Sequence, residues 1–224
     1  MHRDLEPAEP TEGYEPPRSA EELLRRYAAG ERHFQDAMLG GEDLSGQDLR
    51  GINLEDADLE DADFSGADLR DAWMRSANME DANFEGANMV NANLRGSYFH
   101  GANFECVDLT DGAIPSGNGR EVNLKGATLK EAHMPFINLI AANLEDANMQ
   151  GANLSGCRIT RGNLRGANLR GANLREAEVE LARLDNVDLR GADVHQLRAQ
   201  SCSLVGANME GLDLTLMDLR NSTL

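Results

Sequence analysis

Aromatic residues are scarce in this chain: they form 4% of its 224 residues, with a single tryptophan, whereas 41% of the residues are hydrophobic. Aromatic side chains supply much of the buried area in most globular cores, so their scarcity favours a core of repeated aliphatic side chains. Long apolar runs are also missing. None approaches the roughly 20 residues of a membrane-spanning helix, and the first residues contain no apolar segment typical of a secretion signal. The sequence therefore predicts a cytoplasmic protein that does not contact a membrane.

Groups that could carry catalysis or hold a metal are equally sparse. The three cysteines, Cys106, Cys157 and Cys202, lie far apart, without CxxC spacing or a histidine cluster beside them. The glycines form no phosphate-binding loop motif, and no pair of residues resembles a nucleophile with its base. These features predict reduced thiols, no metal, no cofactor and no enzymatic activity.

Basic residues are few in the first half of the chain. The formal net charge is −18, and residues 40 to 112 hold 17 acidic and 4 basic residues, whereas residues 113 to 224 hold 13 and 12. Such a balance disfavours binding to nucleic acid or to anionic membranes and favours either solubility or a partner with a basic surface.

The chain divides into three segments. Residues 1 to 18 are acidic and hold four of the six prolines, so we expect a disordered tail. Residues 19 to 30 predict a short helix, because Ser19 and Glu22 form a capping-box pattern and a glycine closes the segment. Residues 31 to 224 carry a repeat.

The repeat is five residues long. From Phe34 onward every fifth position is a core candidate, and 37 of these 39 positions hold Leu, Ile, Met, Val or Phe. Ala stands two places earlier in 21 of 38 cases, with Asn or Asp between them in 26 of 38. A five-residue period would spread apolar residues over every side of an α-helix, which excludes a helix or coiled coil. A small inward residue, an outward Asn and a large inward residue, followed by a corner, indicate short extended segments that close into stacked coils.

Runs such as ANFEG, ANLRG and ADLRD resemble the pentapeptide-repeat family, whose pattern is A(D/N)LXX, and the resemblance covers residues 34 to 224. It implies an all-β fold, a right-handed quadrilateral β-helix with about twenty residues per coil and about nine to ten coils. The segment ELLRRYAAGERHF is similar to the N-terminal capping helix of cyanobacterial-type members. The resemblance thus assigns a capping role to residues 19 to 30.

Two places depart from the regular wall. The first is residues 115 to 120, where turn-forming residues replace both inward positions. We expect a loop that bulges from the wall, either as a distorted side or as a whole extruded pentad. The second is Phe136, at a corner position that usually holds Gly or a polar residue. The regular part predicts an internal aromatic ladder of Phe64, Phe84 and Phe104.

Outward positions that depart from Asn or Asp mark candidate binding residues. Trp73 and Tyr98 stand at such positions with arginines nearby, and an exposed aromatic ring beside Arg is typical of a binding hot spot. The candidate partner-binding residues are Trp73, Arg75, Arg95, Tyr98, Pro115, Asn118, Arg120 and Phe136.

The end of the chain is unusually apolar, and the repeat reaches the last residue without a following helix. Uncovered backbone pairing groups and apolar core favour an end-to-end homodimer. Its candidate interface consists of Leu212, Leu214, Leu216, Met217 and Leu219.

Two functions are compatible with these features. The first is a non-catalytic, regulatory scaffold that binds a protein partner on the side of the rod; some relatives of the cyanobacterial type are linked to control of cell differentiation. The second follows from the resemblance to bacterial members that mimic duplex DNA and bind a type II topoisomerase such as gyrase. The acidic residues from Glu42 to Asp111 would supply that mimicry. An arginine series in the second half would interrupt it: Arg158, Arg161, Arg165, Arg170 and Arg175.

Overall fold

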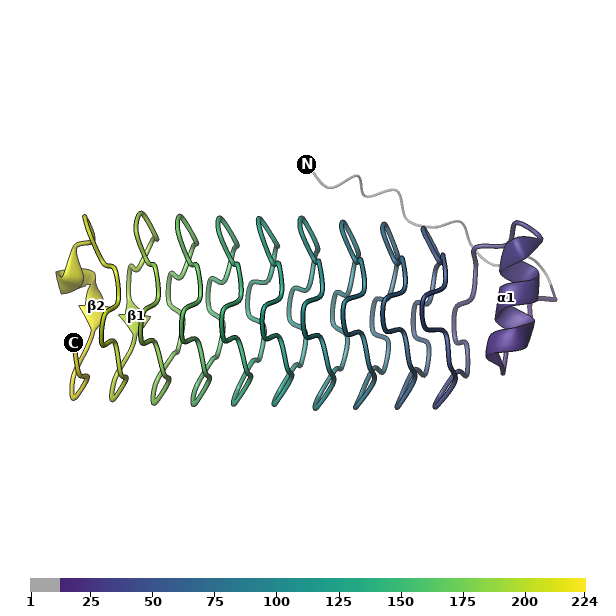
Figure 1. The fold of residues 1–224 in the computed structure, drawn as a ribbon, viewed down its shortest axis with the longest axis horizontal. Coiled ribbons are helices and arrows are strands. Elements are labelled where there is room, and N and C mark those ends of the chain that lie inside the picture. Colours follow the sequence, from purple (N-terminus) through teal and green to yellow (C-terminus); the bar gives the residue numbers. More distant parts are fainter. Residues whose placement is uncertain (1–12) are drawn as a thin grey trace.

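The computed structural model describes residues 13–224, and they form a rod of stacked coils (Figure 1). One helix, α1 (Ala20–Ala28), lies at one end of the rod, and the C-terminus lies at the other. The other named elements belong to the last coils: β1 (Leu197–Arg198), the 3-10 helix η1 (Leu214–Leu216) and β2 (Met217–Asp218). β1 and β2 pair in parallel, with Leu197 opposite Met217.

The wall between the ends repeats every twenty residues. Each outward residue bridges in parallel to the residue twenty places later, as Asp63 does to Asn83 and Asn83 to Asn103. Each coil has four outward residues, spaced five positions apart, so four such ladders run along the rod. Most bridges stay isolated because the chain turns a corner after each short extended side. The predicted stacking of coils at a twenty-residue interval is therefore confirmed.

Corners and outward side chains explain the residue preferences of the repeat. The second corner residue has a positive φ, for example +57° at Asp61 and +64° at Gly66, a conformation that Gly, Asn and Asp adopt most readily. The outward Asn stabilises the corner that follows it: Asn83 Oδ1 accepts from the N–H of Glu85 at 3.2 Å. It also joins the coils, since Asn103 Nδ2 donates to Asn83 Oδ1 at 3.1 Å.

The core lies on the inside of the coils and is aliphatic, with a short aromatic stack. The rings of Phe64 and Phe84 are 5.1 Å apart, and those of Phe84 and Phe104 are 4.7 Å apart, both stacked. The predicted phenylalanine ladder is confirmed.

Helix α1 covers the first coil. The Ser19 side chain accepts from the N–H of Glu22 at 3.3 Å, as the capping-box pattern predicts, while the Glu22 carboxylate accepts from the N–H of Arg18. Leu23 is fully buried against the core. Two polar contacts tie the helix to the wall: the N–H of Ala20 donates to the Glu42 carboxylate, and the Tyr27 hydroxyl donates to a main-chain carbonyl, both at 2.8 Å.

The chain before α1 also packs on the rod. The Pro17 carbonyl accepts a hydrogen bond from the N–H of Met38 at 2.9 Å. Donor and acceptor are as far apart in sequence as in the bond from the Asp58 N–H to the Ala37 carbonyl within the wall. The Tyr14 hydroxyl donates to the Gln35 carbonyl at 2.8 Å. Tyr14 and Pro17 are thus held against the first coil, contrary to the disordered tail predicted for this part; the rest of the predicted tail, residues 1 to 12, lies outside the described part.

The predicted loop at residues 115 to 120 does not form. Asn118 bridges to Tyr98 and to Asn138, so the wall is neither distorted nor extruded there. Gly119 leaves interior space that the Phe99 ring fills, since a Cβ on Gly119 would lie 2.8 Å from Phe99 Cδ2. A large residue one coil earlier thus compensates for two small inward residues, Gly117 and Gly119.

Candidate partner-binding surface

Seven of the eight candidate partner-binding residues lie on or beside one edge of the rod. The carbonyls of Arg75, Arg95 and Pro115 accept from the corner N–H groups of the preceding coils, which places these residues in one row. Trp73 belongs to the ladder on one side of this row, and Tyr98 belongs to the ladder on the other side. We call this set the edge surface: Trp73, Arg75, Arg95, Tyr98, Pro115, Asn118 and Phe136. Arg120 lies outside it, at the next corner.

Two aromatic rings of the edge surface are open to solvent. Phe136 is 68% exposed and Tyr98 is 56% exposed, whereas Trp73 is half-buried. Phe136 occupies a corner with φ +58°, where a side chain without a local hydrogen bond costs about 1 to 2 kcal/mol. Its ring lies over Gly156, since a Cβ there would be 2.6 Å from Phe136 Cδ1. The wall thus bears a strained corner that presents an apolar ring.

The arginines of this surface differ from those on another corner. Arg75 Nε lies 3.6 Å from the Glu55 carboxylate, and Arg95 is exposed. Arg50 instead donates two hydrogen bonds to Asp48, at 2.6 and 2.7 Å, and these bonds lower the pKa of that carboxyl to about 2. Arg50 is therefore engaged within its own coil, Arg75 pairs with Glu55 of the preceding coil, and Arg95 presents an exposed positive charge at the edge.

The acidic residues of the first half are spread over several sides. Asp43 stacks on Asp63, as the twenty-residue interval predicts. Amides separate other carboxylates in the ladders: Asn78 donates to Asp58 at 3.3 Å, and Asn83 donates to Asp63 at 3.1 Å. These bonds offset part of the repulsion between stacked acids.

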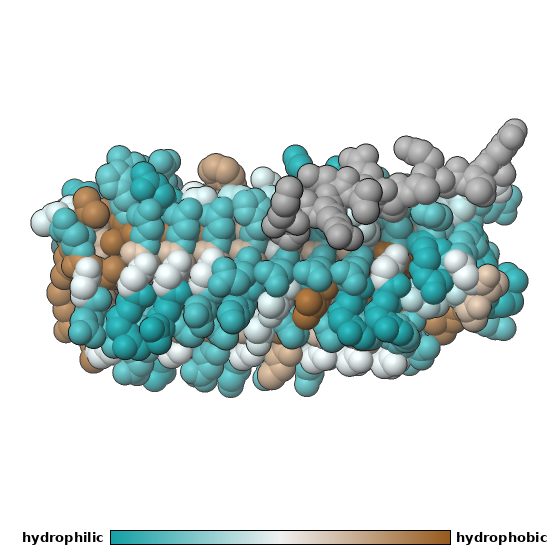
Figure 2. Space-filling view, turned by 90° about the horizontal axis from the view of Figure 1, so that it is seen from above, coloured by the Kyte–Doolittle hydropathy of each residue, from teal (hydrophilic) through white to brown (hydrophobic). Residues whose placement is uncertain are grey.

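The C-terminal end departs from the regular wall. The ladder through Asn173 and Asp193 stops there, because residues 214 to 216 form η1, in which the Asp213 carboxylate accepts from the N–H of Thr215 at 3.0 Å. Leu214 and Leu216 are each 39% exposed. Figure 2 shows apolar atoms gathered at this end of the rod.

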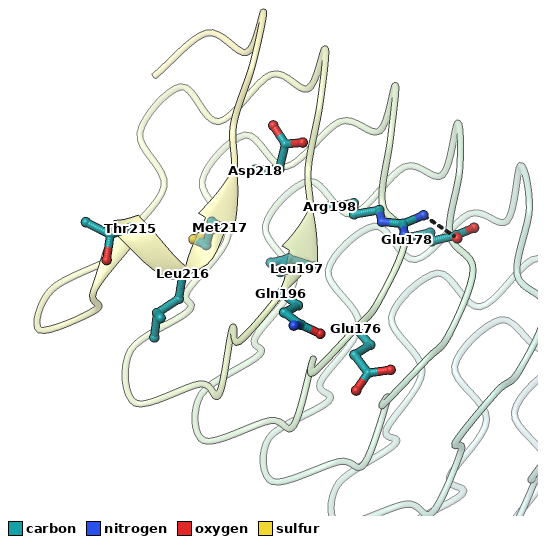
Figure 3. Close-up of a pocket in the computed structure, with 9 residues that line it drawn as sticks. All are labelled: Glu176, Glu178, Gln196, Leu197, Arg198, Thr215, Leu216, Met217 and Asp218. Atoms are coloured by element: carbon teal, nitrogen blue, oxygen red, sulfur yellow. Dashed lines mark hydrogen bonds and ion pairs between the residues drawn. The ribbon is translucent and has the colours of Figure 1, made fainter.

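A groove of about 630 Å³ lies beside this irregular side (Figure 3). Leu197, Leu216 and Met217 contribute apolar lining, and the Arg198 guanidinium is 3.1 Å from the Glu178 carboxylate across neighbouring coils. The polar members of the lining were not predicted from the sequence, because their meeting depends on the change of path at η1. They are Glu176, Glu178, Gln196, Arg198, Thr215 and Asp218.

The cysteine thiols differ in their exposure to solvent. Burial raises the pKa of the Cys157 thiol to about 12, while Cys106 is exposed. No group of three or more metal-binding side chains occurs within residues 13–224. Over the same residues, no helix combines the length and hydrophobicity needed to cross a membrane.

Comparison with known families identifies the repeat that forms this wall. The model for pentapeptide repeats matches eight copies, at residues 43–75, 77–111, 123–161 and 162–196, which is more than half of the chain. The chain belongs to the pentapeptide-repeat family. No curated protein sequence matches it significantly.

The chain is similar to several solved pentapeptide-repeat proteins. HetL, from the cyanobacterium Nostoc and described as involved in regulation of heterocyst differentiation, has 24% identity and a TM-score of 0.52, covering 92% of this chain and 94% of its own. QnrB1, a plasmid-mediated fluoroquinolone resistance protein, has 21% identity and a TM-score of 0.44, covering 86% and 91%. A further Nostoc pentapeptide-repeat protein has 23% identity and a TM-score of 0.24, covering 92% and 100%. At 24% identity, the likeness to HetL concerns the fold alone.

Proposed function

We propose that this pentapeptide-repeat protein is a non-catalytic regulatory scaffold that binds a protein partner through the edge surface. The observation that carries the proposal is that the exposed rings of Tyr98 and Phe136 lie along the same edge of the rod as Arg75 and Arg95. Aromatic and arginine side chains dominate the binding energy of many protein interfaces. An apolar ring on a strained corner has no role in packing the core of the rod.

The wall supplies what such a site needs. Because the backbone ladder fixes each coil against the next, the side chains of the edge surface stand on a rigid support, and their ordering cost on binding is small. Partner groups that match this surface are aromatic or proline side chains for the rings and carboxylates for the arginines.

Capture of partners with the purified protein tests the proposal. The test variant combines Trp73→Ala, Arg95→Ala and Phe136→Gly, and the matched control changes Lys125→Ala and Arg165→Ala on the opposite corner. Circular dichroism checks that both variants keep the fold. We expect the edge variant to lose a protein that the wild type and the control retain; equal capture by all three would place the binding site elsewhere.

The second candidate function is mimicry of duplex DNA toward a type II topoisomerase. The excess of acidic residues between positions 40 and 112 favours it, and Arg158 and Arg165 in the later coils oppose a continuous negative stripe. A supercoiling assay with purified gyrase separates the two candidates. Inhibition or protection of gyrase supports mimicry, and no effect at high micromolar protein rejects it.

We also propose that two copies associate through the C-terminal coils. The exposed Leu214 and Leu216 and the end of the ladder at Asp193 support this arrangement, because an open ladder and uncovered apolar side chains both favour pairing. The partly buried members of the candidate interface, Leu212, Met217 and Leu219, pack against the core behind them.

A further inference from the structure

One side of the rod changes its chemistry along its length. Its outward residues form the ladder Asp58, Asn78, Tyr98, Asn118 and Asn138, with a corner on each edge. Around Asp58 and Asn78, this side and its corners hold the acids Glu55, Asp56, Asp58, Glu60, Asp61, Glu80 and Asp81. Over the next three coils, the same surface holds a single acid, Glu121. We call this later stretch the Tyr98 zone and define it by Arg95, Tyr98, Asn118, Arg120, Phe136 and Ile140.

The Tyr98 zone presents apolar side chains where the preceding coils present carboxylates. Tyr98 and Phe136 are exposed, and Ile140 is half-buried on the corner opposite Phe136. Both corners beside Asn138 carry an apolar residue at positive φ, +58° at Phe136 and +59° at Ala141. A left-handed backbone is unfavourable for side chains that cannot form a local hydrogen bond, and such strain is concentrated at functional sites. The two corners therefore favour a role of this zone in recognition.

Two arginines of the zone have no carboxylate partner. Five arginines occur between residues 40 and 120, and three of them form ion pairs: Arg50 and Arg70 at 2.6 Å and Arg75 at 3.6 Å. Arg95 and Arg120 are exposed and form no ion pair with residues 13–224. They stand on opposite corners of the side, one coil apart. In a chain with a net charge of −18, two unpaired guanidinium groups on one side favour an anionic ligand.

An open hydrogen-bond donor belongs to the same zone. Elsewhere in this ladder an asparagine donates to the residue one coil earlier: Asn78 Nδ2 to Asp58 at 3.3 Å, and Asn138 Nδ2 to Asn118 Oδ1 at 3.2 Å. Asn118 follows Tyr98, which has no amide or carboxylate oxygen, and its Nδ2 donates to no group within residues 13–224. Two guanidinium groups and one amide are thus available to the acceptors of a partner.

The size of the zone selects the kind of partner. Three coils at about 4.8 Å and one extended side at about 3.3 Å per residue give a surface of roughly 15 by 10 Å. A stable interface between two folded proteins covers about 800 Å² on each of them. The zone alone is therefore too small to dock a second rod. It matches an extended segment of roughly four residues.

The neighbouring coils limit the bound segment on both sides. The acids around Asp58 and Asn78 repel an acidic stretch that extends in that direction. In the other direction Glu178 pairs with Arg158 at 3.3 Å and with Arg198 at 3.1 Å, so these arginines are already engaged. An acidic segment that is longer than the zone gains nothing from either neighbour.

We infer that the Tyr98 zone binds a short acidic segment of the protein partner: its carboxylates pair with Arg95 and Arg120, and an aromatic, proline or aliphatic side chain packs against the exposed rings. The inference rests on the proposed function, because the zone shares Arg95, Tyr98 and Phe136 with the edge surface. It adds the charge and the length of the bound segment. It also gives Arg120, which lies outside the edge surface, a part in binding.

Selection from a phage library of random short peptides tests this assignment on the immobilised full-length protein. We expect the retained peptides to carry paired acids beside an aromatic or proline residue. The test variant Arg95→Glu with Arg120→Glu should not retain them. The control Arg165→Glu with Arg170→Glu changes two exposed arginines on the corners beside Asn168, on another side of the rod, and should retain them as the wild type does.

The affinity of one selected peptide separates charge from packing. A counterpart with Asn and Gln in place of Asp and Glu should bind the wild type at least about ten-fold more weakly, because the charge-assisted pairs are lost. Phe136→Gly removes the ring and suits the left-handed corner, so the affinity should fall about five-fold with the fold intact. Leu181→Gly is the matched control, since Leu181 is also an exposed apolar residue at positive φ but lies outside the zone. Fluorescence anisotropy measures the affinities, and circular dichroism checks the fold.

Several outcomes would overturn the inference. They are selection of basic or wholly apolar peptides, no enrichment over an empty support, equal retention by the Arg95→Glu, Arg120→Glu variant, and equal affinity for the acidic and amide peptides. The proposed function is judged separately. A failed selection together with loss of a captured protein in the edge variant would reject the short acidic segment and keep the proposed function. Equal capture by the wild type, the edge variant and its control would reject the proposed function itself.

Discussion

The phenyl ring of Phe99 occupies the interior space that a side chain at Gly119, one coil later, would need. A Cβ on Gly119 would lie 2.8 Å from both Cδ2 and Cζ of that ring. The ring also makes an edge contact with Phe104, with centroids 5.6 Å apart. The interior is thus filled jointly by neighbouring coils: a small inward residue in one coil is balanced by a large inward residue in the coil before it.

Substitutions at this pair should be strongly coupled. Gly119→Leu overfills the site and should lower the free energy of unfolding by at least about 1 to 3 kcal/mol. Phe99→Ala leaves a cavity and should cost about 3 to 5 kcal/mol. The double change Phe99→Ala with Gly119→Leu restores the usual large inward residue, so it should be more stable than the sum of its single changes. Urea unfolding followed by circular dichroism measures all three, and additive losses would contradict the compensation.

The C-terminal coils should set the oligomeric state. We expect the wild type to be a dimer at micromolar concentration by light scattering. Leu214→Glu with Leu216→Glu should give a monomer, because each charge would be buried at the interface. Leu181→Glu is the matched control, since Leu181 is 52% exposed but stands on the side wall. A monomeric wild type would reject this interface.

Two aspartate–arginine pairs should make stability fall in acid. Hydrogen bonds from Arg50 and Arg190 lower the pKa values of Asp48 and Asp188 to about 2. In the unfolded chain an aspartate titrates near about 3.9, so the folded form binds its proton less readily. The contribution of both groups is complete above about pH 4 and is lost as the pH falls through about 2.

Thermal melts between pH 6 and pH 2 check this dependence. The double variant Asp48→Asn with Asp188→Asn should show a smaller decrease in melting temperature across the acid range than the wild type. Asp111→Asn removes an exposed carboxylate that forms no ion pair with an arginine within residues 13–224, and it serves as the control. Parallel curves for the wild type and the double variant would contradict the assignment.

One thiol of the three should react quickly in the native protein. Cys106 is exposed at a corner, whereas Cys157 is fully buried and the Cys202 thiol donates to the Val179 carbonyl at 2.9 Å. Burial raises the pKa of both buried thiols, which lowers their thiolate fraction. Reaction with a chromogenic disulfide should therefore give one fast equivalent, and Cys106→Ser should remove it. Ser76 and Ser116 hold corresponding corners with positive φ, so the substitution fits the fold.

The regular part of this fold could be predicted from its five-residue pattern, because each position of the pentad has one environment. Phe64 and Leu169 are buried where the pattern puts them. The pattern also predicted arginines near the outward Trp73 and Tyr98 side chains. Their role in binding stays a prediction.

The features that could not be predicted depend on pairs of residues a coil apart or on the ends of the rod. Turn-forming residues at 115 to 120 favour a loop locally, but the neighbouring ladders and the Phe99 ring keep them in the wall. Similarly, the Pro17 carbonyl accepts a hydrogen bond from the first coil before α1 begins, although its local sequence resembles a disordered tail. In both places, pairing with a neighbouring coil outweighed the local conformational preference of the sequence.

The position of α1 has a consequence for how the molecule is made. Because the helix and the first coil leave the ribosome before the rest, every later set of twenty residues meets a finished template whose open edge supplies its hydrogen-bond partners. Assembly can then proceed in the direction of translation, with the entropic cost of loop closure met one coil at a time. We expect the reverse order under denaturing stress, with the rod fraying from the newest coil back towards the oldest.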